Sequence, residues 1–489
     1  MIAIPSYRID GELYRSPHTV IYRGMQVDEQ KSVILKTLAS QYPTPVEIAQ
    51  LLHESEILKD LNLPGVVKLY KLETYNNLPL LILEDFGGIS LKDSIGNNQL
   101  ELPNFLQIGI KLAETLGQLH QQQIVHKDLK PSNIIVNIET GEVKITDFAI
   151  ASQLPGENAA QGHPNLLEGT LAYMSPEQTG RMNRTLDYRT DFYSLGVTFY
   201  EILTDRLPFA SNDPLEIVYN HIASEPIPPQ QIKPEIPTAI SEIVLKLMAK
   251  NAEDRYQSAA GILADLEICL NLLQTHGEIT DFIPGRLDVL SQLLIPQKLY
   301  GRENQVNELL AAFERVATGL STSDRLNQGL NKPASLILVS GYSGIGKSAV
   351  VNEINKPITR LKGYFISGKF DQFKRNIPYA SFSQAFGSLM RQILTEPTAK
   401  IQELREKILT ALESNRQVIV DIIPEVELII GKQSSDKDPI NRVPTNPTES
   451  QNRFNRAFKA FIHVFTQREH PLVIFLDDLQ WADSATLKL

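Results

Sequence analysis

The chain has 489 residues, of which 42% are hydrophobic and 21% are charged, a composition typical of globular domains. Its formal net charge of −10 argues against a general nucleic-acid binder and against a protein of anionic membrane surfaces. Because Cys269 is the single cysteine, and because neither a secretory signal nor an apolar run long enough for a membrane span occurs, we expect a cytoplasmic protein without disulfides.

The first part of the chain predicts short strands interrupted by one helix. The sequence TPVE at 44–47 has the pattern of a capping box with proline at the first helical position, and apolar residues follow it at helical spacing. After the sequence FGG at 86–88 the pattern becomes helical, most clearly over 105–122 and 191–203. We therefore expect a strand-rich lobe, a glycine hinge and a helical lobe. The predicted strands of the first lobe lie at 19–23, 33–36, 66–69 and 80–84.

The second part of the chain follows a stretch with several glycines and prolines at 271–297, which we interpret as a linker. From Leu299 the pattern alternates between strands and helices. The continuous apolar run at 335–340 predicts a buried parallel strand, and the run at 472–476 predicts another. This alternation is typical of an α/β domain.

The sequence HKDLKPSN at 126–133 is the strongest chemical signal, because it resembles the catalytic loop H-R-D-L-x-x-x-N of protein kinases. The resemblance implies that Asp128 accepts the proton of the incoming hydroxyl and that Asn133 holds Mg²⁺. Lys130 resembles the lysine of the serine/threonine subclass, which faces the γ-phosphate. A solvated polar loop is the competing interpretation, and further kinase motifs in the family's order argue against it.

Those motifs extend the resemblance over roughly 7–270. Lys36 ends the sequence VILK at the position that pairs with the α- and β-phosphates, and Glu54 lies on the apolar face of its predicted helix, where a charge needs a partner. The resemblance therefore implies an ion pair between Lys36 and Glu54. Asp147 opens the sequence DFA at the DFG position of the main Mg²⁺ ligand. Thr170 lies where this subclass carries a threonine near the catalytic aspartate.

The resemblance also implies structural contacts and an ATP site. Asp191 would hold the backbone of the catalytic loop, and Arg255 would pair with Glu177 of the sequence SPE, which matches the A-P-E motif. Glu84 and Phe86 would belong to the hinge that contacts adenine. The residues outside the catalytic loop that are implied to bind ATP are Val20, Lys36, Glu84 and Phe86.

The glycine-rich loop departs most clearly from the family pattern G-x-G-x-x-G-x-V. Aligned on its valine, the chain carries Leu13, Arg15 and His18 at the three glycine positions, and Pro17 lies between them. Glycine permits close approach of the backbone to phosphate, and proline has no N–H to donate. We therefore expect a weakened or differently shaped phosphate lid.

Two further departures lie beside the catalytic residues. Lys127 replaces the arginine before the catalytic aspartate, and Ala149 replaces the glycine of DFG. Lysine cannot reproduce a bidentate guanidinium contact, and alanine restricts the backbone rotation that glycine allows. Between Asp147 and Thr170 the only hydroxyl belongs to Ser152. We therefore do not expect activation by phosphorylation of this segment, and we expect control by the second domain instead.

The sequence GYSGIGKS at 341–348 fits the P-loop pattern G-x-x-x-x-G-K-[ST]. Backbone N–H groups at the start of the following helix would bind the phosphates, Lys347 would reach the β- and γ-phosphates, and Ser348 would bind Mg²⁺. A glycine turn beside a basic helix start is the competing interpretation. The predicted nucleotide-binding residues of this motif are Gly341, Gly344, Gly346, Lys347 and Ser348.

The sequence LVIFLDD at 472–478 has the pattern of a Walker B strand. Asp477 would hold Mg²⁺, and Asp478 stands in the nucleotide site where many relatives carry a glutamate that positions water. Aspartate is shorter, so we expect slow hydrolysis. The sequences LYGRE at 299–303 and LQWAD at 479–483 resemble signalling ATPases of the AAA-like, STAND type.

Together these features resemble the N-terminal part of the multi-sensor signal transduction multi-kinases of bacteria, especially cyanobacteria, and the sequence GKFDQF at 368–373 does so in particular. The resemblance implies ATP and Mg²⁺ as cofactors, protein substrates with serine or threonine hydroxyls, and sensor (GAF) and histidine-kinase domains in a longer chain. In this class the strand beside the P-loop strand follows Walker B in the sequence. We therefore expect an ATPase domain that is incomplete at the C-terminus and whose P-loop strand lacks a partner.

We predict an α+β two-lobed protein-kinase fold at 7–270, with lobes at 7–84 and 89–270, followed by an α/β P-loop ATPase domain at 298–489. The favoured function is ATP-dependent phosphorylation of serine or threonine, regulated by the ATPase domain. One alternative is a pseudokinase that binds nucleotide and acts as a scaffold. The other alternative makes ATP hydrolysis by the second domain the principal activity.

Overall fold

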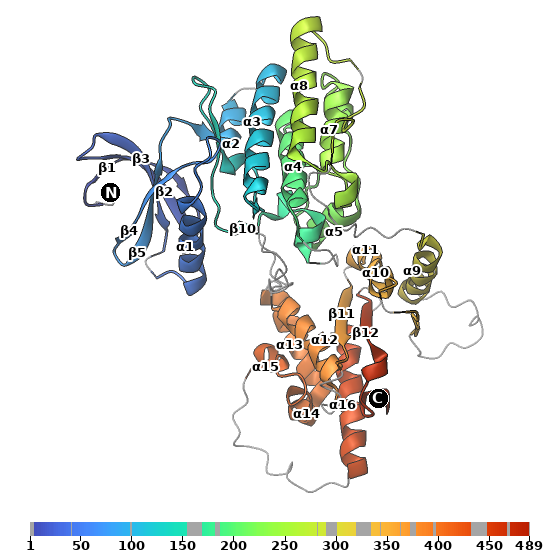
Figure 1. Cartoon of the computed structure of the whole chain (residues 1–489). Coiled ribbons are helices and arrows are strands. Elements are labelled where there is room, and N and C mark those ends of the chain that lie inside the picture. Colours follow the sequence, from blue (N-terminus) through green and yellow to red (C-terminus); the bar gives the residue numbers. More distant parts are fainter. Residues whose placement is uncertain are drawn as a thin grey trace. The chain divides into compact units, whose positions relative to one another are not determined.

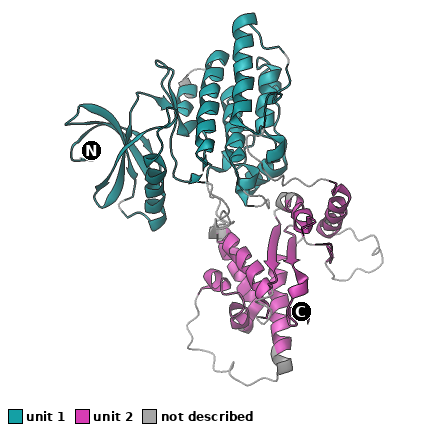
Figure 2. Ribbon diagram, in the orientation of Figure 1, with its two compact units in different colours: residues 1–162, 166–298 teal, residues 163–165, 299–489 magenta. Residues whose placement is uncertain are grey.

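The computed structural model divides the chain into two compact units, residues 1–162 with 166–298 and residues 163–165 with 299–489 (Figure 2). Each unit is described by itself. The residues that the structure describes are 4–40, 42–97, 100–153, 169–180, 186–280, 282–289, 301–318, 334–342, 344–361, 363–371, 378–394, 398–431, 447–466 and 470–488.

The first unit begins with a five-stranded antiparallel sheet in the order β1-β2-β3-β5-β4 (Figure 1). Its strands alternate buried apolar and exposed positions, as in β3, where Val33 and Leu35 are fully buried. Strand β1 was not predicted, and the predicted strand at 66–69 is wrong, because β4 begins only at Leu69. The strands are β1 (Tyr7–Arg15), β2 (Thr19–Gln26), β3 (Lys31–Leu38), β4 (Leu69–Tyr75) and β5 (Leu78–Glu84).

Helix α1 (Pro45–Lys59) packs on this sheet, and its predicted capping box is present. The Thr44 hydroxyl accepts a hydrogen bond from the Glu47 N–H at 3.3 Å, and the Glu47 carboxylate accepts one from the Thr44 N–H at 2.7 Å. Glu54 lies two turns further along the same helix face and is fully buried. The cap therefore fixes the start of the helix that carries Glu54.

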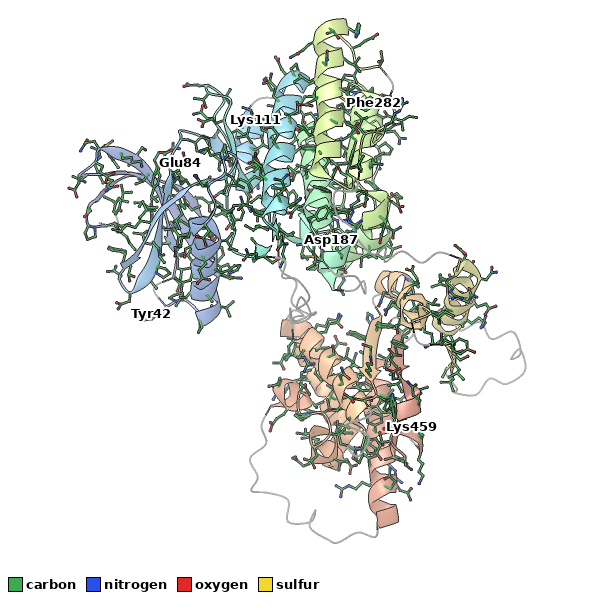
Figure 3. The ribbon with its side chains drawn as sticks, viewed as in Figure 1. Tyr42, Glu84, Lys111, Asp187, Phe282 and Lys459 are labelled. Atoms are coloured by element: carbon green, nitrogen blue, oxygen red, sulfur yellow. The ribbon has the colours of Figure 1, made fainter. Side chains whose placement is uncertain are left out.

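The helical lobe follows β5, at the point where Glu84 is labelled in Figure 3. Helix α4 is buried along nearly its whole length, as its apolar sequence predicts, and α3 packs against α8 (Figure 1). Helix α8 continues to His276, so the predicted linker start at 271 is wrong; Gly277 ends the helix in a left-handed conformation. The helices are α2 (Leu91–Asn97), α3 (Leu102–Gln121), α4 (Arg189–Thr204), α5 (Pro214–Ala223), α6 (Pro229–Ile232), α7 (Thr238–Leu247) and α8 (Ala259–His276).

Short strands within this lobe position the predicted catalytic segments. A three-stranded sheet in the order β6-β8-β9 flanks the catalytic loop, and β7 pairs with β10 in antiparallel orientation. The catalytic loop thus runs between β7 and β8, and the sequence DFA follows β9. The strands are β6 (Ile89–Ser90), β7 (Ile124–Val125), β8 (Ile134–Val136), β9 (Val143–Ile145) and β10 (Ser152–Gln153).

The second unit contains a pair of parallel strands, β11 (Tyr364–Lys369) and β12 (Leu472–Asp477), among helices. Lys369 is the register partner of Asp477, so the carboxyl ends of both strands meet. The aromatic rings of Phe386, Phe458 and Phe461 pack together in its core. Its helices are α9 (Glu303–Thr318), α10 (Lys347–Asn352), α11 (Asn355–Arg360), α12 (Ala380–Ile393), α13 (Thr398–Leu412), α14 (Arg416–Val420), α15 (Val426–Ile430) and α16 (Pro447–Phe465).

The predicted buried strand at 335–340 is not observed. The segment pairs with none of the described strands, and Leu336 and Leu338 are 98% and 76% exposed. A strand is stable only when a neighbour satisfies its backbone N–H and C=O groups. The apolar composition of this segment therefore cannot bury it without a neighbouring strand.

Among the described helices, none is both long and apolar enough to cross a membrane.

Candidate active site

Three charged side chains from distant parts of the chain meet in the first unit. The Nζ atom of Lys36, on β3, lies 2.7 Å from Oε2 of Glu54, on α1, and 2.7 Å from Oδ1 of Asp147, which follows β9. Lys36 is 5% exposed and Glu54 is fully buried. The predicted contact of Lys36 with Glu54 is thus present, and Asp147 adds a second contact that was not predicted.

The electrostatics of this group favour a cationic lysine. Burial opposes the charge of Lys36, but Asp147 and Glu54 outweigh it, so the pKa of Lys36 lies above its ordinary value. Burial also opposes the charge of Asp147, yet Lys36 holds the pKa of Asp147 below its usual range. For Glu54 burial dominates and raises the pKa despite the neighbouring lysine. Asp147 therefore stays ionised, as its predicted role as a metal ligand requires.

The catalytic loop places its polar side chains around Asp128. Lys130 Nζ lies 2.5 Å from Asp128 Oδ2 and 2.6 Å from the Thr170 hydroxyl oxygen. The Thr170 N–H donates to Asp128 Oδ1 at 2.9 Å, and Asn133 Nδ2 donates to Asp128 Oδ2 at 3.1 Å. The four predicted residues therefore form one hydrogen-bonded group, with the carboxylate of Asp128 at its centre.

Asp191 fixes the backbone of this loop from the buried start of α4. Its Oδ2 accepts from the N–H of His126 at 2.9 Å, and its Oδ1 accepts from the N–H of Lys127 at 2.8 Å. His120 adds a third contact, 2.9 Å to Oδ2. Burial opposes the charge of Asp191, but these partners hold the pKa of Asp191 below its usual range. The loop backbone is thus bound to an ionised carboxylate.

The oxygen atoms of Asp147 and Asn133 suit Mg²⁺, which prefers carboxylate and carbonyl ligands. The Asp147 side chain is 34% exposed, so part of its carboxylate remains open beside the lysine contact. The Thr146 N–H donates to the carbonyl oxygen of Asn133 at 2.9 Å, which links the two segments directly. Because Mg²⁺ usually takes one or two protein carboxylates and completes its shell with phosphate and water, this donor set fits.

Ala149 fits its position without strain. Its φ angle is not positive, whereas Asp147 is left-handed with φ 70°. Phe148 is fully buried and packs on His126, with ring centroids 4.7 Å apart. The His53 ring on α1 is 2.7 Å from the Ala151 carbonyl oxygen, so α1 contacts this segment too. The observed backbone here does not require the glycine that the family motif carries.

The predicted hinge residues lie together at the end of β5. Lys144 Nζ, on β9, is 2.7 Å from Glu84 Oε2, and the Phe86 carbonyl oxygen accepts from Asn137 Nδ2 at 2.7 Å. Val20 is 2% exposed on β2, in the buried apolar cluster of the sheet. The side chain of Glu84 is therefore engaged by Lys144 within the domain.

The turn between β1 and β2 is the predicted phosphate lid, and its backbone N–H groups form hydrogen bonds within the turn itself. Ser16 Oγ accepts from the N–H of His18 at 3.2 Å and from that of Thr19 at 2.9 Å. The Ser16 N–H donates to the Thr19 carbonyl oxygen at 2.9 Å, and Pro17 has none. The tip thus has few N–H groups free for phosphate, as the departure from the glycine pattern predicts. The His18 ring is instead 2.5 Å from Glu47 Oε1 on α1.

Replacing Ser16 by alanine is expected to lower the KM for ATP by about fivefold if one freed N–H group binds phosphate and by up to about thirtyfold if both do. The change frees two N–H groups, and each hydrogen bond to phosphate contributes on the order of 1 kcal/mol. Steady-state kinetics with ATP as the varied substrate measures the effect. Ser40→Ala removes a similar bond, from the Tyr42 N–H at 3.1 Å, and serves as the control. If the KM of Ser16→Ala is unchanged or higher, the hydrogen bonds to Ser16 do not keep these N–H groups from binding phosphate.

The P-loop residues of the second unit lie near the Walker B aspartate. Ser348 Oγ is 3.2 Å from Asp477 Oδ2, the expected pair of Mg²⁺ ligands. Lys347 Nζ contacts the carbonyl oxygens of Gly341 and Tyr342, both at 3.0 Å. Two P-loop glycines, Gly344 and Gly346, have left-handed backbones, with φ 79° and 91°. Phosphate binding here would exchange the two carbonyl partners of Lys347 for phosphate oxygens.

Asp478 lies beside this motif in a left-handed conformation, φ 58°. Its Oδ1 accepts from Gln480 Nε2 at 2.9 Å, and its Oδ2 lies 3.4 Å from Lys369 Nζ. Both carboxylate oxygens are thus occupied by neighbours, and neither Lys369 nor Gln480 was predicted to contact this site. The strand register could have indicated Lys369, since it pairs with Asp477.

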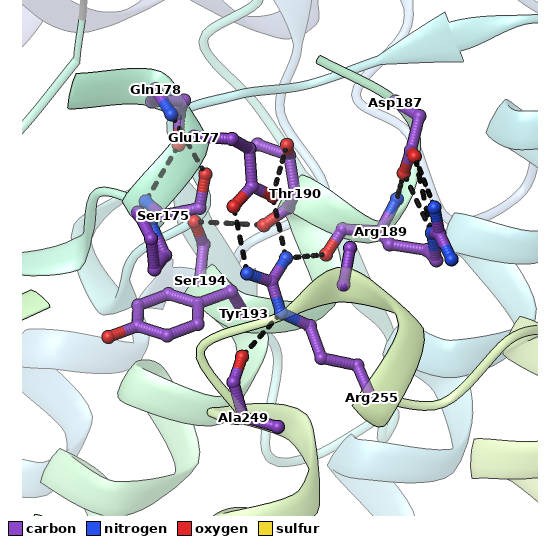
Figure 4. A network of polar contacts seen from close by, with 12 residues as sticks. Ser175, Glu177, Gln178, Asp187, Arg189, Thr190, Tyr193, Ser194, Ala249 and Arg255 are labelled. Atoms are coloured by element: carbon purple, nitrogen blue, oxygen red, sulfur yellow. Dashed lines mark hydrogen bonds and ion pairs between the residues drawn. The ribbon is translucent and has the colours of Figure 1, made fainter. Parts of the chain in front are cut away.

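A buried network beneath the active site contains the predicted pair of Arg255 and Glu177 (Figure 4). Arg255 Nη1 and Nη2 donate to the two carboxylate oxygens of Glu177 at 2.6 and 2.8 Å. The Thr190 hydroxyl donates to Glu177 at 2.9 Å, and Arg255 also donates to the Ala249 carbonyl oxygen at 2.8 Å. The pair therefore joins the end of the SPE segment to α4 and to the loop before α8.

Two family models match the chain. A model of the protein kinase domain matches residues 16–265, and a model of an AAA ATPase domain matches residues 298–489. The first covers strands β2 to β5, most of the helical lobe and the Lys36 and Asp128 groups, and it leaves out β1 and the end of α8. The second covers the P-loop and the Walker B strand. The chain thus contains a protein kinase domain followed by an AAA ATPase domain.

Curated relatives fall into two kinds. Hybrid signal transduction histidine kinase G of Dictyostelium discoideum is 31% identical over 477 residues, which cover 80% of this chain and 13% of that protein. Serine/threonine-protein kinase PknB of Mycolicibacterium smegmatis is 35% identical over 218 residues, 44% of this chain and 34% of that protein. Serine/threonine-protein kinase PrkC of Bacillus subtilis is 29% identical over 275 residues, 54% of this chain and 42% of that protein. The chain spans less than half the length of each.

Proposed function

The chain belongs to the protein kinase family, whose model matches about half of it, and on this premise we propose that it transfers the γ-phosphoryl group of ATP to serine or threonine hydroxyls of proteins. The observation that carries the proposal is the ion pair of Lys36 with both Glu54 and Asp147. This pair brings the phosphate-binding cation and the metal-binding carboxylate to one point. The relatives named serine/threonine-protein kinases support the same chemistry.

In the proposed reaction Asp128 accepts the proton of the substrate hydroxyl while the hydroxyl oxygen bonds to the γ-phosphorus. The bond from the γ-phosphorus to the β,γ-bridging oxygen breaks, and ADP leaves with that electron pair. Lys130, which contacts both Asp128 and Thr170, supplies positive charge beside the transferred group. Thr170 and Asn133 keep the carboxylate of Asp128 oriented for the proton.

Asp147 and Asn133 would hold Mg²⁺, which supplies charge neutralisation on the phosphates when bound. Lys36 would neutralise the phosphates directly, and Glu54 keeps Lys36 in place. The adenine would rest against the hinge at Glu84 and Phe86, with Val20 above it. These assignments use every residue that the kinase resemblance implies for catalysis and ATP binding in this domain.

We propose that the AAA ATPase domain binds ATP through Gly341, Gly344, Gly346, Lys347 and Ser348 and regulates the kinase domain. Asp477 would hold Mg²⁺ together with Ser348, and Asp478 would position the attacking water. The protein is proposed to work in the cytoplasm, with sensor and histidine-kinase domains in the same signalling protein. The relative matched along most of this chain is named a hybrid signal transduction histidine kinase, which supports that setting.

Two variants of the intact protein separate the two ATP sites. Lys36→Met is expected to lower phosphate incorporation into serine- and threonine-containing peptides by about 10²–10³-fold, because it removes the cation that faces the phosphates. It should leave the release of free phosphate by the AAA domain unchanged. Lys347→Ala is the matched control. It should release less free phosphate, and it should still incorporate phosphate into peptides in a way that depends on Lys36.

The outcomes distinguish the rival functions. Incorporation that is equal in wild type and Lys36→Met would contradict the kinase proposal. Binding of Mg²⁺-ATP to the first unit without any incorporation by the wild type would favour a pseudokinase scaffold. If Lys347→Ala releases phosphate at the wild-type rate, the AAA domain is not the site of ATP hydrolysis.

A further inference from the structure

The side-chain amide of Gln178 joins the SPE segment to the catalytic loop. Gln178 lies in the short 3₁₀ helix Pro176–Thr179 and is 8% exposed. Its Oε1 accepts from the N–H of Ser175 at 3.0 Å, a contact visible in Figure 4. Its Nε2 donates to the carbonyl oxygen of Lys127 at 2.8 Å. The oxygen and the nitrogen of the amide therefore both form hydrogen bonds, and the nitrogen bonds to Lys127, the residue directly before Asp128.

The backbone of Lys127 is in a conformation that needs support. Its φ of 67° is left-handed, which lysine rarely adopts outside turns and functional sites. Its N–H is held by Asp191 at 2.8 Å, and its carbonyl oxygen is held by Gln178. Lys127 is therefore fixed from both sides, once by a carboxylate and once by an amide.

The carbonyl of Lys127 and the N–H of Asp128 belong to one planar peptide unit. The hydrogen bond from Gln178 therefore sets the tilt of the plane from which Asp128 projects. The carboxylate of Asp128 must then reach Thr170 and Lys130 at 2.9 and 2.5 Å. A tilt of this plane would move the carboxylate away from both.

We propose that Gln178 is a positioning residue for Asp128, acting through the carbonyl of Lys127. The proposal rests on the proposed kinase function. Thr170 and Gln178 lie eight residues apart in the stretch 170–178. Each end of this stretch therefore contacts the catalytic loop, Thr170 at Asp128 and Gln178 at Lys127. The link is a neutral amide and needs no phosphate, which suits a segment whose single hydroxyl before Thr170 is that of Ser152.

Gln178→Glu tests the proposal with nearly unchanged shape. The introduced carboxylate keeps an acceptor for the Ser175 N–H but turns a second acceptor toward the Lys127 carbonyl. We expect kcat to fall about tenfold to a hundredfold, since small displacements of a catalytic group have effects of this size. The KM for ATP should stay unchanged, because Lys36 and Asp147 are not touched.

The pH dependence provides a readout that a loss of stability would not give. Burial opposite a carbonyl raises the pKa of the introduced carboxyl, and a protonated carboxyl can donate to the Lys127 carbonyl. The kcat of Gln178→Glu relative to wild type should therefore recover as the pH falls from about 8 to about 6. The charged and titratable groups near Gln178 include His126, Lys127, Asp128 and Lys130 of the catalytic loop, Asp191 and the Glu177–Arg255 pair, and all are common to both proteins.

Two further variants complete the test. Ser175→Ala removes the other half of the capping box, the 3.4 Å bond from the Gln178 N–H, and restores the family's A-P-E alanine, so kcat should stay within about twofold. Gln178→Met lacks the donor without adding charge, so kcat should fall without pH-dependent recovery.

Wild-type kcat in a folded Gln178→Glu or Gln178→Met protein would overturn the proposal. So would equal losses in Ser175→Ala and Gln178→Glu without recovery at low pH. If Gln178→Glu does not fold, Gln178→Met alone decides. A wild-type protein without any transfer would instead refute the kinase function on which the proposal rests.

Discussion

Replacing Asp128 by asparagine is expected to lower kcat of phosphoryl transfer by about 10²–10⁴-fold, the usual contribution of a positioned general base. The amide keeps an oxygen that can accept from the Thr170 N–H, so the loop should stay folded. It cannot accept the substrate proton, and its NH₂ group would face the ammonium of Lys130, now 2.5 Å from the carboxylate. The KM for ATP should change little, because Lys36 and Asp147 bind the nucleotide elsewhere in the site.

Rapid-quench measurement of labelled phosphate incorporation gives kcat free of any phosphate released by the AAA domain. Asp205→Asn is the matched control, because Asp205 carries an exposed ion pair with Lys233 at 2.5 Å outside the active site. The control should transfer phosphate at the wild-type rate. Asp128→Asn with kcat within a factor of about five of wild type would rule out Asp128 as the base.

The sequence predicts the residues of the active site more accurately than it predicts the strands of the two units. Asp128, Asn133 and Asp147 are identified by motifs of fixed spacing, and the residue types of these motifs suit phosphoryl transfer. Glu54 could be predicted because a charge on an apolar helix face requires a partner. The family match and the two-lobed fold follow from the same residues.

Other features depend on contacts between distant parts of the chain. The run at 335–340 has the composition of a buried strand, yet pairing requires a neighbouring strand; the order of the motifs predicts that this strand lacks a partner, and no described strand pairs with it. Ser16 occupies the N–H groups of the lid only because the turn folds back on its hydroxyl. Gln178 carried a readable signal, since serine followed three residues later by glutamine is the capping-box spacing. Its contact with Lys127 depends on tertiary structure and could not be predicted.

Replacing Arg255 by methionine is expected to destabilise the first unit by about 3–5 kcal/mol. Arg255 is 1% exposed and donates one hydrogen bond to each carboxylate oxygen of Glu177. Without it Glu177 would remain buried with the Thr190 hydroxyl as its remaining side-chain partner. The loss of stability is large because a buried charge is left without a partner, rather than because an attraction is lost. We therefore expect a larger effect on the free energy of unfolding than on the rate of phosphoryl transfer.

Urea unfolding of the intact protein, followed by a signal from the first unit, measures this change. Lys233→Met breaks the exposed pair with Asp205 and should cost less than about 1 kcal/mol. Adding Glu177→Gln to Arg255→Met removes the stranded charge and should restore part of the lost stability. A cost below about 1 kcal/mol for Arg255→Met would mean that the buried pair contributes no more than a surface one.

The same pair gives the unfolding free energy a defined pH dependence. Burial opposes ionisation of Glu177, but Arg255 holds the pKa of Glu177 below its usual range in the folded protein. The unfolded chain then binds a proton more readily, so the contribution of the pair is complete above about pH 5 and is lost as the pH falls through the folded pKa. Arg255→Met removes the cause of the lowered pKa. Its destabilisation should therefore shrink as the solution becomes acidic, because protonation of Glu177 neutralises the unpaired charge.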